Sequence, residues 1–397
     1  MEYTARAMMR LLQYQGIPLW RNVVFLQFTL QIVSAVLVVS FLTIVFTNLF
    51  REIDQREIPF GFSFLDRSTG IPIGETLIDY TPEDSYRYTL FVAFLNTVKV
   101  AFVGVVFATI VGIIVGVARL SPNWLVNRLA LVYIDVFRNI PLLVQLLFWF
   151  FIVLALPPIR EAYVLGDAFF LSNSGFAMPW VAPQGSFWPW VLVCALGLGA
   201  AFYAARVMER RETESGRASH SLLAFLVITF GVGTAAFFAF GGPLDVTMPE
   251  RGAFERLSGG TQVSGSFLAL LIGLVVYTSS FIAEIVRAGI QSVSKGQTEA
   301  ARSTGLNGTA SLRFVIFPQA LRVIIPPTIS HYLNLTKNSS LAAAIGYPDM
   351  VSVATTLTQT APAVSLIGIV MVSYLGLSLF YALIGNIYNR LIRYKAL

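Results

Sequence analysis

Eight long apolar stretches constrain this chain more than any other feature of its sequence. They lie at roughly 23–50, 90–118, 129–156, 187–206, 221–240, 266–288, 323–346 and 363–388. Crossing a bilayer as a helix takes about 20 mostly apolar residues. Hydrophobic residues make up 56% of the chain and charged residues 12%, against roughly 45–50% and about 25% in soluble proteins. The sequence therefore predicts an all-α, polytopic membrane helix bundle of about eight transmembrane helices. The first stretch is expected to remain in the mature protein as a helix, because it is longer than the apolar core of a signal peptide.

Lys and Arg are distributed unevenly between these stretches. With the N-terminus placed in the cytoplasm, the inside basic residues are Arg6, Arg10, Arg21, Arg119, Arg128, Arg206, Arg210, Arg211, Arg217, Arg287, Lys295, Arg302, Arg313, Arg322, Arg390, Arg393 and Lys395. The outside ones are Arg51, Arg56, Arg67, Arg87, Arg160, Arg251 and Arg256. Cytoplasmic loops are enriched in Lys and Arg, so the pattern predicts a multi-pass protein with an even number of spans and both termini cytoplasmic.

Three expected outside segments interrupt the hydrophobicity. Residues 51–88 are polar and rich in Gly and Pro, and 157–186 and 241–262 read as irregular structure. None is long enough to form an independent domain with its own core.

Several kinds of chemistry are disfavoured by what the sequence lacks. Cys194 is the single cysteine, and His220 and His331 lie far apart, so neither a disulfide nor a metal site is expected. No GxxxxGK[ST] motif occurs, so no phosphate-binding loop for ATP is expected in this chain. No catalytic Ser–His–Asp set stands out. We therefore expect no cofactor in this chain, no catalysis by it and no nucleic-acid partner.

One long inside loop, residues 289–318, carries helix signals. Ser294 and Gln297 have the spacing of a capping box, which predicts a helix start. Gly305 is placed where a helix end needs positive φ. Asn307 can cap a second short helix, which Pro318 would end or kink.

The first of these short helices carries Glu299 near its start, where a negative charge suits the helix dipole. Ala300 and Ala301 would present a face almost without side chains, which lets a partner approach closely. The alternative is a solvated helix whose alanines serve only helix propensity.

Charged and amide side chains also fall inside the apolar stretches, where they usually face the bundle interior. The candidates for a substrate path are Lys99, Arg138, Gln145, Glu284, His331, Asn334, Lys337 and Asn338. Together these side chains could donate hydrogen bonds to an anionic group and accept them from a cationic group. The alternatives are purely structural. Asp135–Arg138 and Glu284–Arg287 could be ion pairs that lock helices within or between themselves, and Lys99 and Lys337 could snorkel to the membrane edge.

Wider motifs carry a family resemblance. Glu299-Ala-Ala-xxx-Gly305, followed by Val315-x-Phe317-Pro318, resembles the EAA loop of ABC importer permeases, with Val and Phe in place of Ile and Leu. Phe137-Arg-Asn-Ile-Pro-Leu-Leu-Val-Gln145 resembles a run of polar amino-acid permeases of the histidine-permease type, from which Asn139 and Ile140 depart. The eight-span plan resembles the larger permease of general L-amino acid and glutamate/glutamine/aspartate/asparagine transporters. The resemblance covers about residues 90–156 and 263–390.

The resemblance implies a type I importer core of five spans within a permease domain at 89–397, preceded by an accessory segment at 1–88. A two-helix insertion would occupy about 157–262. ATPase coupling would fall to residues of the EAA loop, residues 289–318, namely Gly296, Glu299, Ala300, Ala301, Gly305 and Pro318.

The implied partners are a companion permease, in a heterodimer, two ATPase subunits that bind ATP and Mg, a periplasmic amino-acid-binding protein and membrane lipid. The implied function is import of polar or general L-amino acids across the bacterial inner membrane by alternating access. The alternatives are a secondary carrier or channel that needs no ATPase, which the EAA loop disfavours, and a membrane enzyme.

Overall fold

The computed structural model describes residues 13–14, 17–18, 21–215, 220–251 and 257–393. Contacts divide the chain into two units. One comprises Met1–Leu65 with Leu357–Ile369, and the other Asp66–Thr356 with Val370–Leu397. Five basic residues of the predicted charge pattern lie outside the described residues: Arg6, Arg10, Arg217, Arg256 and Lys395.

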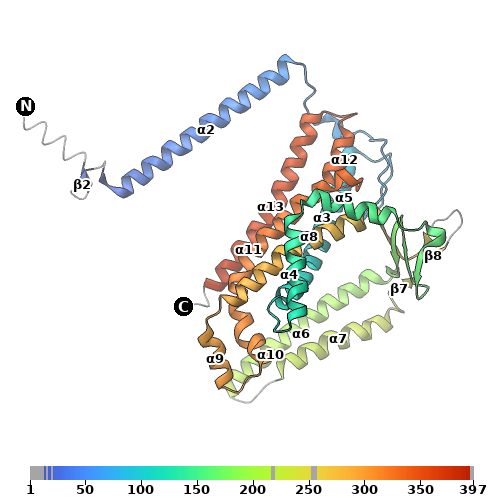
Figure 1. The fold of residues 1–397 in the computed structure, drawn as a ribbon. Coiled ribbons are helices and arrows are strands. Elements are labelled where there is room, and N and C mark those ends of the chain that lie inside the picture. Colours follow the sequence, from blue (N-terminus) through green and yellow to red (C-terminus); the bar gives the residue numbers. More distant parts are fainter. Residues whose placement is uncertain (1–12, 15–16, 19–20, 216–219, 252–256, 394–397) are drawn as a thin grey trace, which may run out of the picture. The chain divides into compact units, whose positions relative to one another are not determined.

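Long helices dominate the described residues (Figure 1). Seven of them are long and apolar enough to cross a membrane, and one bent pair would make an eighth. The seven are α2 (Val23–Gln55), α3 (Tyr86–Ala118), α6 (Phe187–Ser215), α7 (Ser221–Ala239), α8 (Gly265–Gln291), the stretch Gly308–Ile345 that contains α11 (Phe317–Asn338), and α13 (Ala363–Arg393). The predicted all-α bundle of about eight spans is confirmed.

Helix α2 belongs to the smaller unit and consists of 33 residues. It starts at Asn22, whose side-chain oxygen accepts the N–H groups of Val24 and Phe25 at 3.0 and 3.2 Å. At about 1.5 Å per residue the helix is roughly 50 Å long, more than a hydrocarbon core of about 30 Å. None of its apolar window is buried within the chain, so lipid or a partner must cover it.

Close packing of α3 on α8 organises the larger unit. A Cβ on Gly116 would lie 2.6 Å from the carbonyl oxygen of Ala283, and one on Gly112 would lie 2.6 Å from Ile282. Side chains are therefore excluded at these two positions of α3. Small residues of this kind let membrane helices approach backbone to backbone.

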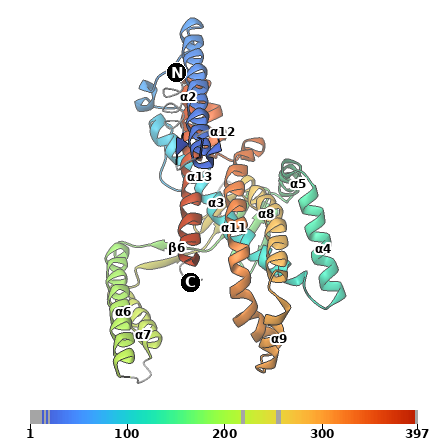
Figure 2. The ribbon, with the colours of Figure 1, turned by 90° about the vertical axis from the view of Figure 1, so that its left-hand side faces the viewer.

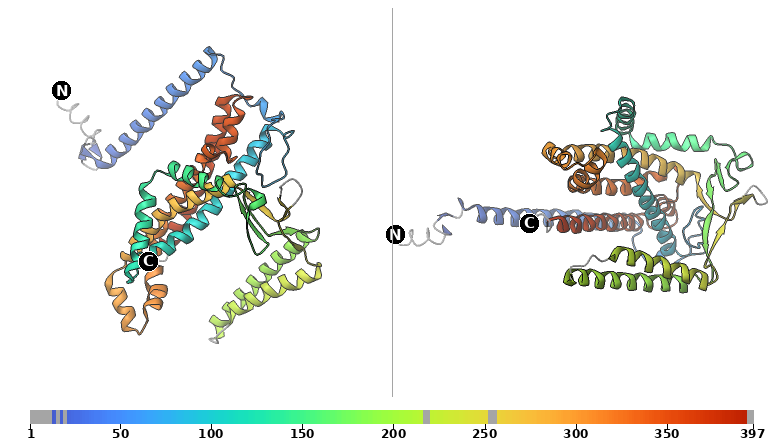
Figure 3. Two further views of the ribbon diagram at one scale, coloured as in Figure 1. Left: turned by 45° about the vertical axis from the view of Figure 1, so that its right-hand side comes forward. Right: turned by 90° about the horizontal axis from the view of Figure 1, so that it is seen from below.

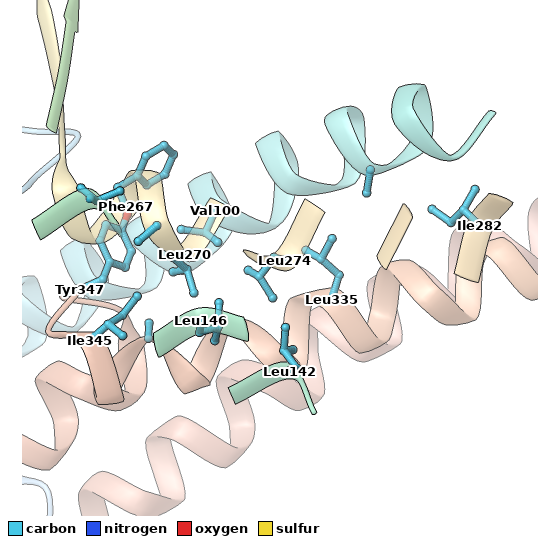
Figure 4. Close-up of a cluster of buried hydrophobic side chains, with 14 of the residues drawn as sticks. Val100, Leu142, Leu146, Phe267, Leu270, Leu274, Ile282, Leu335, Ile345 and Tyr347 are labelled. Atoms are coloured by element: carbon cyan, nitrogen blue, oxygen red, sulfur yellow. The ribbon is translucent and has the colours of Figure 1, made fainter. Parts of the chain in front are cut away.

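The core of this unit lies where α3, α8 and α11 meet α5 (Leu142–Leu154) (Figure 4). Leu146, Leu270, Leu274 and Leu335 are all fully buried there. Each buried leucine of this kind contributes about 1.5–3 kcal/mol in water. In lipid the corresponding gain comes from packing rather than from water exclusion.

The predicted third span, 129–156, is not one straight helix. It is broken into α4 (Trp124–Asn139) and α5, which meet at 107°. Pro141 lacks an N–H and forces Ile140 into an extended conformation, with φ −91° and ψ 129°. The continuous apolar pattern concealed this break.

Helices α6 and α7 form a tight pair. The Trp190 indole N–H donates to the carbonyl oxygen of Gly233 at 3.2 Å. A Cβ on Gly197 would lie 2.7 Å from Val232, so glycine is needed for this approach. These two helices match the predicted spans at 187–206 and 221–240.

Short antiparallel strands occupy the segments expected to be irregular, so that expectation was wrong. A four-stranded sheet has the order β10-β5-β4-β3, and β6 pairs with β7 and β8 with β9. Alternating burial along Phe169–Ser172 and Gly175–Met178 is typical of strands. The four-stranded sheet lies at the end of α8 opposite to α9 (Figure 3). The strands are β1 (Gln13–Tyr14), β2 (Ile17–Pro18), β3 (Tyr163–Leu165), β4 (Phe169–Ser172), β5 (Gly175–Met178), β6 (Trp180–Pro183), β7 (Leu244–Thr247), β8 (Glu250–Arg251), β9 (Leu257–Ser258) and β10 (Thr261–Ser264).

Short helices complete the described chain. They are η2 (Ser63–Asp66), η3 (Ile159–Glu161), α9 (Lys295–Ser303), α10 (Gly308–Ser311), the π-helical turn η5 (Leu312–Ile316), the 3-10 helix η6 (Ser339–Ile345) and α12 (Met350–Leu357). Figure 2 shows α9 beyond the ends of α8 and α11, where the EAA loop joins these two helices.

Candidate functional site

The EAA loop begins with α9, as predicted, but its capping box does not form. Ser294 is the N-cap residue, yet its side chain makes no capping hydrogen bond. Gln297 instead accepts a hydrogen bond from the Gln319 side-chain amide at 3.1 Å. A side chain expected to cap the start of the first helix therefore links α9 to the first turn of α11.

The end of α9 agrees with the sequence. Gly305 has φ +81°, and its N–H donates to the carbonyl oxygen of Arg302 at 2.9 Å. The N–H of Leu306 reaches back to Ala301 at 3.2 Å. These two bonds form a Schellman motif, which stops a helix and turns the chain.

A second short helix follows, as predicted, but it does not end at Pro318. The Asn307 side chain caps α10 by accepting the N–H of Ala310 at 2.8 Å. The chain then passes through η5 into α11, with Pro318 in the first turn of α11. Proline is tolerated there because first-turn N–H groups have no partner within their own helix.

The two alanines of α9 do not share one small face, so that prediction was wrong. Ala301 is 4% exposed and packs inward, whereas Ala300 and Glu299 are exposed. Successive helical residues are about 100° apart. The small face is formed instead by Ala300 and Gly296, four residues earlier. A Cβ on Gly296 would meet no atom within 4 Å.

Lys99 does not lie free. Its ammonium forms an ion pair with Glu75, and the two side chains are 17% and 9% exposed. It also lies 4.4 Å from the centre of the Phe267 ring. The second Glu75 carboxylate oxygen accepts the backbone N–H of Ser264 at 3.0 Å. We call Glu75, Asn96, Lys99, Ser264 and Phe267 the Lys99 cluster.

Asn96 connects this cluster to the segment before α12. Its amide donates to the carbonyl oxygens of Glu75 at 2.8 Å and Pro348 at 3.0 Å. The Asn96 Oδ1 atom is buried and has no hydrogen-bond partner among the described residues. Thr97 accepts the N–H of Met350 at 3.0 Å.

Asp349 is fully buried beside this connection. Its carboxylate accepts the N–H of Ser352 at 2.8 Å and the Tyr374 hydroxyl at 3.2 Å. Burial raises the pKa of Asp349 to about 6, because removal from water penalises the charged form more than these hydrogen bonds stabilise it.

A second group, the Arg138 cluster, contains Arg138, Phe281, Glu284, Arg287 and His331. The Phe281 ring lies 5.1 Å from His331 and 5.3 Å from the Arg138 guanidinium. Glu284 and Arg287 form the predicted i,i+3 pair, with Nε to Oε2 at 2.9 Å. The structure thus brings together three predicted path residues from α4, α8 and α11.

The predicted Asp135–Arg138 lock is wrong. Within the described residues no ion pair joins these side chains, and Arg138 lies over the Phe281 ring instead. The Asp135 backbone carbonyl accepts the Asn139 amide at 2.7 Å. The break after Asn139 shifts the end of α4 away from the expected straight span.

Gln145 is 3% exposed and lies at the break between α4 and α5. Its amide donates to the carbonyl oxygens of Phe137 and Ile140, both at 2.9 Å. These acceptors belong to the last turn of α4, whose carbonyls have lost helical partners. In this structure Gln145 stabilises the bend.

The polar stripe on α11 separates into two parts. His331 and Asn338 are half-buried, while Asn334 and Lys337 are exposed. Within the part of the chain that the structure describes, Asn334, Lys337 and Asn338 are joined to neither cluster.

Sequence reasoning missed Glu75 and Asp349. Asp349 precedes α12 directly and accepts an N–H of its first turn, a helix-start signal that could have been noticed. Glu75 is one of several acidic residues in a polar segment, and no local pattern distinguishes it.

Comparison with known proteins shows which family this chain resembles. The model of the binding-protein-dependent transport system inner membrane component matches residues 108–394. A putative amino-acid ABC transporter permease protein, YhdX of Escherichia coli K12, is 44% identical, over 91% of this chain and 92% of that protein. The general L-amino acid transport system permease protein AapQ of Rhizobium johnstonii is 39% identical, over 94% and 92%.

A third relative also matches over nearly the whole chain. The glutamate/glutamine/aspartate/asparagine transport system permease protein BztB of Rhodobacter capsulatus is 38% identical, over 94% of each chain. The resemblance carried by the EAA loop is therefore confirmed, and the chain belongs to the family of binding-protein-dependent transport system inner membrane components.

Proposed function

We propose that this chain is the membrane-spanning permease subunit of an ATP-driven importer of polar or general L-amino acids. The observation that carries the proposal is likeness to three permeases whose names specify amino acids, at 38–44% identity over more than nine-tenths of this chain. The exposed EAA loop supports the same assignment, because a secondary carrier has no use for an ATPase contact.

ATP is hydrolysed by separate subunits in this proposal. The sequence has no phosphate-binding GxxxxGK[ST] loop, and the chain itself catalyses no reaction. Two partner ATPases bind ATP and Mg, and their closure moves the EAA loops. The permease domain comprises 89–397, with 1–88 and the insertion at 157–262 as accessory parts.

The EAA loop, residues 289–318, supplies the ATPase contact. Gly296 and Ala300 form a small exposed face of α9, and Glu299 adds a negative charge beside it. Ala301, Gly305 and Pro318 act behind this face, by packing and by turning the chain. A partner groove lined with basic groups would match this helix.

A companion permease supplies the second wall of the substrate path. Asn334 and Lys337 are exposed on α11, and polar side chains inside a membrane are costly against lipid. A heterodimer would place this stripe against another chain or a water-filled path. Amino acid delivered by a periplasmic binding protein would then pass between the two permeases by alternating access.

The orientation places both termini and the EAA loop in the cytoplasm of a bacterial inner membrane. The excess of basic residues on that side supports it. In a Cys194→Ser background, a cysteine at Ser68 should react with an impermeant maleimide from outside the cell, and one at Thr309 should not. The reverse pattern contradicts this orientation.

The deciding experiment is uptake by proteoliposomes that contain the permease pair and its ATPase. Radiolabelled L-amino acids and a periplasmic amino-acid-binding protein are supplied outside, and ATP is enclosed. We expect uptake that requires both ATP and binding protein. Uptake at the same rate without ATP would identify a secondary carrier and contradict the proposal.

A further inference from the structure

Segment 67–85 brings Glu75 into the bundle from a short closed loop. Ser68 and Ser85 are bridged at the base of this loop, and Thr69 contacts Thr89 of α3 at 3.3 Å. Glu75 lies between these anchored ends and reaches Lys99 and Ser264, the N-cap residue of α8. The base is thus fixed on α3, while the tip carries a carboxylate.

The Glu75 carboxylate is bound as a ligand carboxylate would be. One oxygen faces the Lys99 ammonium, and the other accepts the Ser264 N–H at the N-terminus of α8. A positive side chain together with a helix N-terminus favours anions. The Phe267 ring lies 4.4 Å from the ammonium, and it packs at a tilt of 51° against the Tyr347 ring, with the ring centres 5.7 Å apart.

Two features argue against a simple structural tether. A buried ion pair stabilises a fold no better than apolar residues of the same shape, so stability alone does not explain it. Asn96 is 0% exposed and donates to the Glu75 backbone, but its Oδ1 has no hydrogen-bond partner in the described part of the chain. A buried acceptor without a partner costs free energy, and an ammonium group beside the bound carboxylate would satisfy it.

We propose, on the basis of the amino-acid import function above, that the Lys99 cluster binds the zwitterionic part of the transported amino acid. Lys99 and the Ser264 N–H hold its α-carboxylate, and Asn96 Oδ1 accepts its α-ammonium. In this structure Glu75 occupies the carboxylate position. Substrate enters when the tip of segment 67–85 withdraws, so Glu75 acts as a competitor that closes the empty site.

The test is binding of radiolabelled L-amino acids to the purified permease–ATPase complex without binding protein. Glu75→Gln keeps the shape of the side chain but removes the competing charge. We expect it to bind amino acids about tenfold more tightly than wild type, because the fraction of open sites rises. Glu83→Gln, which changes an exposed carboxylate of the same segment, should bind as wild type does.

Lys99→Gln should weaken this binding about tenfold or more, and the methyl esters of the same amino acids should not compete. Loss of Lys99 alone leaves Glu75 buried and unpaired, which can prevent folding. The double variant Glu75→Gln/Lys99→Gln removes both charges, and its folding is checked by thermal unfolding. The proposal expects it to bind weakly, whereas a tether predicts binding equal to wild type.

The inference is overturned if Glu75→Gln binds no tighter than wild type, or if the folded double variant binds equally well. Uptake by the wild-type complex separates the two proposals. Wild-type uptake that needs ATP, combined with unchanged binding by Glu75→Gln, refutes this site and leaves the importer function standing. Absence of amino-acid uptake by the wild type refutes the function itself.

Discussion

The EAA loop and the Lys99 cluster are opposite kinds of site within one chain. In α9, Gly296, Glu299 and Ala300 are exposed, and every bond that shapes its end lies within a few residues. In the cluster, Glu75 and Lys99 are nearly buried, and their partners come from distant parts of the sequence. A surface for a partner can be built locally, while a buried polar site needs the assembled bundle.

This difference predicts different consequences of substitution. A change on the exposed face of α9 should leave the fold intact and remove the partner's contact. A change in or beside the cluster should alter the stability of the chain, because a buried polar group without its partner is costly. Function and stability can therefore be measured separately in the two regions.

The largest expected effect belongs to Ala300→Trp. Ala300 is exposed, so tryptophan fits the isolated chain but holds α9 away from an ATPase groove. Overpacking of a close contact costs roughly 1–3 kcal/mol, so ATP-dependent uptake should fall by about a hundredfold. The measurements are uptake in proteoliposomes and copurification of the ATPase at equal permease levels.

The matched control is Ala300→Ser, which keeps the side chain small and should retain uptake. The thermal unfolding midpoint should be equal for both variants. If Ala300→Trp imports normally with its ATPase attached, the exposed face of α9 is not the contact, and the contrast between the two regions fails.

Local signals explain why the EAA loop could be predicted in detail. Gly305 and Asn307 each act on backbone groups within four residues. The assignment of both alanines to one face failed, because Ala301 is buried by packing that a helix pattern does not show. Gln297 was misread for a similar reason, since its partner Gln319 lies 22 residues further on.

The Lys99 cluster could not be predicted, because its contacts are long-range. Glu75 is 24 residues from Lys99 and 189 from Ser264. Hydrophobic periodicity identified the helices but not which polar residues meet between them. The broken third span had a signal in Pro141, but the surrounding apolar run outweighed it.

The second prediction concerns pH and Asp349, which contacts α13 beside the cluster. Its pKa is raised from 3.8 to about 6 by burial. The folded chain therefore binds this proton more tightly than the unfolded chain. Stability should fall as pH rises from about 4 to about 6 and then level off, by about 3 kcal/mol in total.

Asp349→Asn cannot titrate, so its stability should not show this fall between about pH 4 and pH 6. The measurement is the difference in unfolding midpoint between wild type and Asp349→Asn in detergent across this pH range. Asp245→Asn, which changes an exposed carboxylate in β7, should follow wild type. Parallel curves for wild type and Asp349→Asn would show that Asp349 is not buried as described.

The smallest effect is expected from a substitution in the EAA loop, at the residue that caps its second helix. Asn307→Ala removes the side-chain oxygen that accepts the Ala310 N–H at 2.8 Å. Loss of such a cap costs about 1 kcal/mol. The cost falls on α10, a helix of four residues at the surface. It should therefore speed local opening about fivefold without moving the global unfolding midpoint.

Hydrogen exchange of peptides covering 306–316 measures this opening directly. Peptides from α3 and α8 around Lys99 should exchange as in wild type, because no bond of the cap reaches them. Asn307→Asp, which retains an accepting oxygen, should restore the slower exchange. If Asn307→Ala instead speeds exchange in α3 and α8, the loop is coupled to the bundle core through the chain itself. The two regions would then form one cooperative unit, and the separation of local surface from buried site would be lost.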